Sequence, residues 1–152
     1  MISIEQYMEA ADYLRGRLPA GIETAVVLGS GLGKLTERIE AAVRLPYADI
    51  PHFPRSTVAS HAGVLVAGAL SGRPVAAFSG RFHYYEGYSM ETVAFYVRVL
   101  HLLGVRRLIL TNAAGGVNER FQVGDLMLIT DHIKLTAETP SRGTVPPAFG
   151  AR

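Results

Sequence analysis

Three polar side chains alternate with aromatic ones in residues 81–86 (RFHYYE), directly after an apolar run. In extended backbone, Arg81, His83 and Tyr85 would share one side. The guanidinium of Arg81 can hold a phosphate through two parallel hydrogen bonds, His83 can donate another, and Tyr85 offers a ring and a hydroxyl to a sugar. The pattern therefore predicts a phosphate and sugar site. The alternative is that Arg81 pairs with Glu86 while the aromatic rings belong to the core.

A glycine-rich turn offers a second place for an anion. Residues 29–33 (GSGLG) lie between a β-prone run, residues 25–28, and a helical stretch at residues 34–39. Glycines let backbone N–H groups approach an anion at a helix end, and Ser30 adds a hydroxyl donor. The spacing matches neither the dinucleotide fingerprint nor the Walker loop, and Leu28 stands where a nucleophile elbow requires glycine. A tight turn without a ligand is the alternative.

Two further segments have polar or small side chains of the kind that surround ligands. Asn112 follows an apolar run, residues 108–111, and precedes Ala113 and Ala114, whose small side chains leave room for a ligand. Ligands of open α/β sheets bind beyond the carboxyl ends of the strands. An Asn side chain bonded to its own backbone is the alternative. His61 lies in a loop from which it could reach an anion, and an ordinary exposed His is the alternative.

Composition and charge exclude several classes of function. The chain has 152 residues, no Cys and a net charge of +2, and its arginines are scattered. Absence of Cys excludes thiolate chemistry, and no pair or triad of His, Asp and Glu has metal-ligand spacing. We therefore expect no metal, no nucleic-acid surface and no organic cofactor. No apolar stretch approaches the ~20 residues of a membrane helix and no secretory leader is recognisable, which predicts a cytoplasmic protein without membrane contact.

The elements that must position these residues alternate between strands and helices. Ser3 and Gln6 form a capping pattern, which predicts a helix from residue 4 to about 17. The other expected elements are a hairpin of strands 64–70 and 75–78, a helix over 90–103, and strands at 108–111 and 125–130. This alternation predicts an α/β fold in one domain, residues 1–152, with a mixed, largely parallel central sheet flanked by helices.

Five segments, taken together and in order, resemble one family over nearly the whole chain. They are residues 27–33 (VLGSGLG), 53–57 (FPRST), 61–63 (HAG), 80–88 (GRFHYYEGY) and 111–116 (TNAAGG). Each is weak alone, but their joint order and spacing resemble the trimeric purine nucleoside phosphorylases. The resemblance implies the nucleoside phosphorylase fold and a reaction in which phosphate attacks C1′ of a purine (deoxy)nucleoside. The products would be the free base and (deoxy)ribose 1-phosphate.

The resemblance also implies roles for individual residues, with inorganic phosphate as co-substrate. Phosphate would be held by Ser30, His61, Arg81, His83, Asn112 and Ala113. Tyr85, Ala113 and Ala114 would contact the nucleoside, with Tyr85 at the ribose. His83, Tyr85 and Glu86 would form the catalytic group, in which Glu86 supports His83 or Tyr85.

Members of this family continue well beyond position 152, and their base-binding residues lie in that later part. We therefore expect this chain to be the N-terminal part of the fold and to form a homotrimer, or to associate with a chain that supplies the remainder. The alternative function is a truncated phosphate- or nucleoside-binding remnant, or one part of a split enzyme, without activity alone. A nicotinamide-binding redox domain is disfavoured by the glycine spacing.

Overall fold

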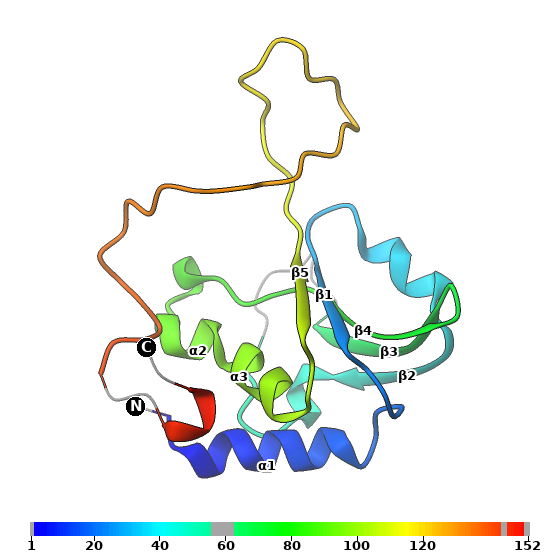
Figure 1. Cartoon of the computed structure of the whole chain (residues 1–152), viewed down its shortest axis with the longest axis vertical. Coiled ribbons are helices and arrows are strands. Elements are labelled where there is room, and N and C mark those ends of the chain that lie inside the picture. The colour runs from blue at the N-terminus through cyan, green and yellow to red at the C-terminus, as the bar shows by residue number, and fades with distance from the viewer. Residues whose placement is uncertain (1, 56–62, 144–145, 151–152) are drawn as a thin grey trace.

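A mixed five-stranded sheet forms the centre of the molecule (Figure 1). The computed structural model describes residues 2–55, 63–143 and 146–150. In spatial order the strands are β2 (Glu40–Pro46), β3 (Val64–Leu70), β4 (Arg73–Ser79), β1 (Thr24–Leu28) and β5 (Arg107–Leu110). Strand β1 runs parallel to both β4 and β5, whereas β3 pairs antiparallel with β2 and β4. The expected α/β fold with a mixed sheet is confirmed.

The α-helices pack on one side of this sheet (Figure 1). Helix α1 (Ile4–Arg15) begins at the expected capping box of Ser3 and Gln6 and ends slightly earlier than expected. The helix expected over residues 90–103 is divided at Ala94 into α2 (Met90–Val93) and α3 (Phe95–Leu102). Short 3-10 helices occupy Gly33–Arg38, Tyr47–Asp49, Tyr84–Glu86 and Pro147–Phe149. The first of these is the expected helical stretch after the glycine-rich turn.

The alternation of side chains along the strands divides the core in two. Leu65 and Ala67 of β3 face α1 and α3, and Val66 between them faces the other side. The larger core includes Tyr7, Leu14, Val27, Tyr47, Phe78, Phe82, Phe95 and Val99. The smaller one, covered by the 3-10 helix Gly33–Arg38, comprises Leu28, Ile39, Val66, Val75 and Ala77. The middle strands β3, β4 and β1 are therefore buried on both faces, whereas β2 and β5 are more exposed.

The expected hairpin is present, and its turn explains its register. Ser71 and Gly72 both have positive φ, at 51° and 74°, so they form the two-residue turn that matches the twist of paired strands. Strand β4 begins directly afterwards, with Leu70 paired to Arg73. In the hairpin Ser79, the last residue of β4, is paired with Val64, and on the other side of β4 it lies opposite Leu28, the last residue of β1.

The prediction of a strand at residues 125–130 is wrong. Residues 111–138 contain no helix or strand, and they form the long loop, yellow to orange in Figure 1, that projects from the body. Leu126 and Leu128 are 97% and 87% exposed. An apolar, β-prone segment forms a strand only where a neighbouring strand accepts its backbone hydrogen bonds. No described element lies beside this one, so its sequence preference has no structural effect.

Candidate functional site

Three adjacent, parallel strands end at the same edge of the sheet, and each is followed by a predicted site segment. Residues 29–33 follow β1, Arg81 lies two residues after β4, and Asn112 lies two residues after β5. Because β1 is hydrogen-bonded to both β4 and β5, these segments converge although they are far apart in sequence. This is the edge at which ligands of open α/β sheets bind.

The ends of β1 and β5 are joined through Thr111. Its hydroxyl donates to the Val27 carbonyl at 2.8 Å and accepts from the Gly29 N–H at 2.8 Å. The two backbones are so close that a Cβ on Gly29 would lie 2.6 Å from the Thr111 carbonyl oxygen. Glycine at this position is therefore required by packing. The backbone of Gly29, directly before Ser30, is held in place by these contacts.

Arg81 is held by groups from two sides. Its Nη1 donates to the Thr111 carbonyl oxygen at 2.8 Å, and its Nε donates to Nε2 of His83 at 3.0 Å. The guanidinium is planar and fixes these two directions at once, so the remaining N–H groups also have a defined orientation. Arg81 is half-buried at the carboxyl edge, which leaves part of the fork accessible to an anion.

His83 has a defined tautomer because its two ring nitrogens meet different partners. A guanidinium N–H can only donate, so Nε2 accepts from Arg81. The ring proton therefore lies on Nδ1, which is 2.9 Å from Oε1 of Glu86. The same oxygen accepts from the His83 backbone N–H at 2.8 Å, and the Glu86 side chain is only 2% exposed. The expected contact between Glu86 and His83 is thus present.

Tyr85 joins this group, although not through extended backbone. Residues Tyr84–Glu86 form a 3-10 turn closed by Gly87, whose φ is 91°. The turn stacks the Tyr85 ring on the His83 ring, with centroids 4.6 Å apart, and leaves Tyr85 75% exposed. Phe82 points the other way into the core and is 3% exposed. Phe82 therefore points to the side expected of it. Tyr84, which was expected on the same side, is instead 51% exposed.

The remaining predicted residues lie at the same edge or outside the described residues. Ser30 is exposed on the loop after β1, and Asn112, Ala113 and Ala114 are exposed after β5. The Asn112 amide donates to the carbonyl of Ala113 at 3.1 Å, which is the local backbone contact considered as an alternative to ligand binding. His61 lies outside the described residues.

Tyr47 makes a buried contact beside Arg81 that sequence reasoning missed. Its side chain is 1% exposed, and its hydroxyl donates to the Gly80 carbonyl at 2.8 Å, directly before Arg81. Its backbone N–H donates to the Gly63 carbonyl at 2.8 Å. Burial raises the pKa of Tyr47, so the hydroxyl remains a donor. No local pattern indicates this contact, because it spans 33 positions.

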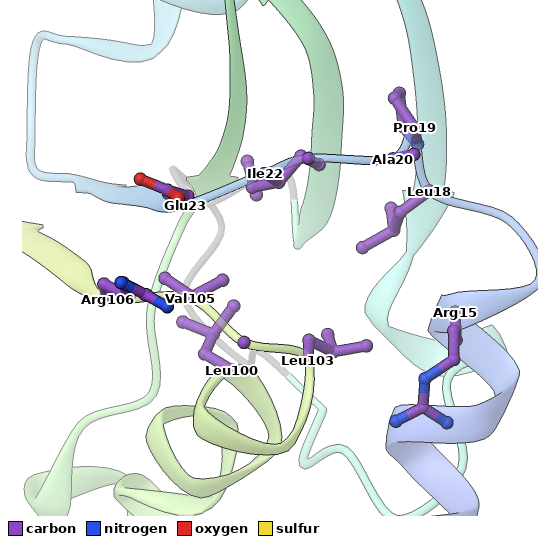
Figure 2. Close-up of a pocket in the computed structure, with 13 residues that line it drawn as sticks. Arg15, Leu18, Pro19, Ala20, Ile22, Glu23, Leu100, Leu103, Val105 and Arg106 are labelled. Carbon is purple, nitrogen blue, oxygen red and sulfur yellow. The ribbon is translucent and has the colours of Figure 1, made fainter.

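A cavity of about 470 Å³ lies at the opposite end of β1 (Figure 2). It is lined by apolar side chains that include Leu18, Leu100, Leu103 and Val105, and also by Arg106. Among residues 2–55, 63–143 and 146–150, no group of three or more His, Asp and Glu could hold a metal ion. No helix in the same part of the chain is long and apolar enough to span a membrane.

Comparison with known proteins identifies the class to which this fold and site belong. The model of the phosphorylase superfamily matches residues 23–151, so the chain belongs to that family. The matched region includes β1 to β5 and every predicted site residue. The expected fold of nucleoside phosphorylase type is also supported by solved structures.

Within that family the chain is most usefully compared with purine nucleoside phosphorylases. Purine nucleoside phosphorylase 1 of Geobacillus stearothermophilus is 53% identical over 144 residues, which cover 95% of this chain and 53% of the relative. The Rattus norvegicus enzyme is 50% identical over 151 residues, covering 97% and 52%. A purine nucleoside phosphorylase solved with ribose-1-phosphate has a TM-score of 0.73 and 45% identity over 81% of this chain and 45% of its own. The chain spans about half the length of the relatives it matches.

Proposed function

We propose that this chain forms the phosphate- and sugar-binding part of a purine nucleoside phosphorylase. The observation that supports this most directly is the linked group of Arg81, His83 and Glu86 at the carboxyl edge of β1, β4 and β5. The glycine loop containing Ser30 and the segment beginning at Asn112 converge on the same edge. Relatives that are about 50% identical over the aligned residues are purine nucleoside phosphorylases, and a purine nucleoside phosphorylase at 45% identity is solved with ribose-1-phosphate.

Phosphate would be held by donors of three kinds. Arg81 supplies cationic N–H groups, Ser30 supplies a hydroxyl, and the glycine loop supplies backbone N–H groups. His83 contributes differently, because its Nε2 carries no proton in the arrangement described above. In this arrangement the Nε2 lone pair accepts from Arg81, so His83 would support phosphate binding by orienting the Arg81 fork toward the anion. Asn112, Ala113 and His61 complete the proposed phosphate site, as the resemblance implies.

In the proposed reaction, a phosphate oxygen forms a bond to C1′ of the nucleoside as the bond from C1′ to the purine nitrogen breaks. The bonding electrons leave with the purine, which takes up a proton to become the free base. Positive charge develops on the sugar ring during this exchange, and the dianionic nucleophile beside it stabilises that charge. Holding phosphate in place also removes much of the entropic cost of bringing two reactants together. Tyr85, with Ala113 and Ala114, would contact the sugar.

Glu86 would act through His83 and not on the substrate. Its carboxylate is buried and contacts both the ring and the backbone N–H of His83. This fixes the orientation of the ring and the tautomer whose Nε2 accepts from Arg81. No metal or organic cofactor enters the proposed reaction. A cytoplasmic location, expected from the sequence pattern, is a further part of the proposal. A homotrimeric assembly, or association with a chain that supplies the remaining half, is also part of it, as the resemblance implies.

The direct test is an assay of phosphorolysis by the intact natural protein that contains these residues. Inosine is incubated with and without inorganic phosphate, and release of hypoxanthine is followed by absorbance. The proposal expects base release that requires phosphate and yields ribose 1-phosphate. Phosphate-dependent thermal stabilisation without base release would instead support a binding remnant. Base release that is independent of phosphate would contradict the proposed reaction.

A further inference from the structure

Thr111 contacts both halves of the proposed phosphate site, although it is not among the residues proposed to bind phosphate. Its side-chain oxygen bonds to β1 on either side of Leu28, donating to the Val27 carbonyl and accepting from the Gly29 N–H. Its backbone carbonyl accepts from Nη1 of Arg81. One residue therefore contacts the glycine loop with its side chain and the arginine with its main chain.

The regular backbone hydrogen bonding between β1 and β5 ends just before the site, so the groups beyond it require other partners. The last paired residues are Val27 and Leu110, and the Thr111 N–H still donates to the Val27 carbonyl at 3.1 Å. Beyond this point, the Thr111 hydroxyl accepts the Gly29 N–H in place of a backbone carbonyl. Its β-branched side chain has few rotamers, so the hydroxyl is held where the buried Gly29 needs it.

The Thr111 carbonyl is placed by the same contact. It lies so close to Gly29 that a Cβ there would approach it to 2.6 Å, and Arg81 donates to it at 2.8 Å. A shift of the Gly29 loop would therefore move this carbonyl, and Arg81 would lose the acceptor that orients its fork. The side-chain and main-chain contacts of Thr111 are mechanically coupled through a single residue.

We propose that Thr111 is a positioning residue that keeps the loop of residues 29–33 and the Arg81 guanidinium in register, so that both donate to the same phosphate. This inference rests on the proposed function, because it assumes that phosphate binds at this edge. It adds a residue whose hydroxyl is required for anion affinity although it touches no substrate.

Three substitutions in the intact natural protein test the proposal. Thr111→Val keeps the shape and removes the hydroxyl, whereas Thr111→Ser keeps the hydroxyl. Thr24→Val is the matched control, since the Thr24 hydroxyl contacts Arg107 at the opposite end of the same strand pair. Calorimetry with inorganic phosphate gives the affinity, and steady-state kinetics gives KM for phosphate and for inosine separately.

We expect Thr111→Val to weaken phosphate affinity by about tenfold or more, as misplaced donors do. Thr111→Ser should restore the affinity to within about twofold of wild type, and Thr24→Val should not change it. KM for phosphate should rise in Thr111→Val while KM for inosine changes little, a split that general destabilisation does not produce. Equal phosphate affinity in wild type and Thr111→Val would overturn the inference while leaving the proposed function intact. A wild-type protein that does not bind phosphate would overturn both.

A measurement on the wild-type protein keeps the proposal testable should Thr111→Val not fold. The Gly29 amide proton donates to the Thr111 hydroxyl, so bound phosphate should slow its exchange with solvent. Slower exchange at Gly29 on addition of phosphate would support the proposal. Unchanged exchange at Gly29, together with slower exchange elsewhere in residues 29–33, would contradict it.

Discussion

Arg81 and Thr111 are joined by a 2.8 Å hydrogen bond although the strands that precede them are not neighbours. Arg81 follows β4 and Thr111 follows β5, and β1 lies between these two strands. The bond therefore passes over the end of β1, where the chain has Gly29. A side chain at that position would collide with the Thr111 carbonyl that accepts this bond. The absence of a side chain at Gly29 is thus a condition for the contact between Arg81 and Thr111.

Gly29→Ala should therefore damage both stability and phosphate binding. The new Cβ would lie 2.6 Å from the Thr111 carbonyl oxygen and 2.9 Å from the Asn112 Cα, so backbone must move. Overpacking of this kind costs about 1–3 kcal/mol. We expect a lower free energy of unfolding by chemical denaturation and, in calorimetry, weaker phosphate binding because Arg81 loses its acceptor.

Gly16→Ala is the matched control for this substitution. Gly16 follows α1 with φ of −76°, and the nearest atom to a Cβ there is the Asp12 carbonyl oxygen at 4.0 Å. Alanine fits this conformation, so stability should be unchanged or slightly higher. A Gly29→Ala variant as stable as Gly16→Ala would show that the backbone at Gly29 yields without cost.

Arg81→Ala should weaken phosphate binding more than Arg81→Lys does. Both variants lose the fixed fork that contacts His83 and Thr111, but lysine keeps a positive charge near the anion. Calorimetric titration with inorganic phosphate should rank wild type first, Arg81→Lys second and Arg81→Ala last. Arg106→Ala is the control, because Arg106 is exposed at the far end of the sheet, beside the cavity. Equal phosphate affinity in wild type and Arg81→Ala would remove Arg81 from the site.

Tyr47→Phe tests a buried hydrogen bond and its dependence on pH. Removing the hydroxyl leaves the Gly80 carbonyl without its donor, which costs about 1–3 kcal/mol. Burial raises the pKa of Tyr47, so above about pH 10 the unfolded chain releases a proton that the folded protein retains. The unfolded state then binds fewer protons, and wild-type stability falls as pH rises. Chemical denaturation at increasing alkaline pH should show that the free energy of unfolding falls less steeply with pH in Tyr47→Phe than in wild type.

The free energy of unfolding of Tyr47→Phe should still decrease somewhat with alkaline pH, because burial also raises the pKa of Tyr7 and Tyr96. Tyr84→Phe is the matched control, since Tyr84 is 51% exposed, and its stability should equal that of wild type at neutral pH. Parallel alkaline curves for wild type and Tyr47→Phe would contradict the assignment of this dependence to Tyr47.

The parts of the fold that the sequence predicts well are those specified by neighbouring residues. Ser3 and Gln6 lie three positions apart and indicate the start of α1, and Ser71 with Gly72 specifies the turn of the hairpin. Strand β2 was missed because it does not alternate cleanly and contains an irregular pairing near Ala41, whose φ is 48°. Residues 125–130 were predicted to form a strand that is absent, because an apolar pattern does not show whether a neighbouring strand is there to pair with it.

The same distinction applies to the candidate site. Contacts within residues 81–86 were predictable because Glu86 is three positions from His83 and a short turn brings them together. The contributions of Thr111 and Tyr47 were not, since their partners lie 30 to 84 positions away and depend on the order of the strands. The sequence predicted the groups proposed to bind an anion, whereas the contacts of Thr111 and Tyr47 with the segments that carry them follow from the sheet topology.

The last prediction concerns residues 1–152 prepared alone: we expect little or no phosphorolysis of inosine. The proposed site supplies donors for phosphate and contacts for the sugar, but no described residue at this edge has been assigned to the purine. The leaving base gathers negative charge as the glycosidic bond breaks. Without a group that donates a hydrogen bond to the base, the transition state loses about 3–4 kcal/mol, by analogy with the loss of one oxyanion donor.

The outer surface of β5 leads to the same expectation. This strand is at the end of the sheet, and Ile109 and Leu110 are 51% and 65% exposed. The loop beyond it exposes Val117 and Leu126 almost completely. A strand edge beside such apolar surface favours association with further chain. We therefore expect the isolated residues to self-associate in sedimentation experiments, and activity to appear when a longer natural form of the protein is assayed. Phosphate-dependent inosine cleavage by material whose mass corresponds to residues 1–152 alone would refute this and would require a purine-binding group within the chain.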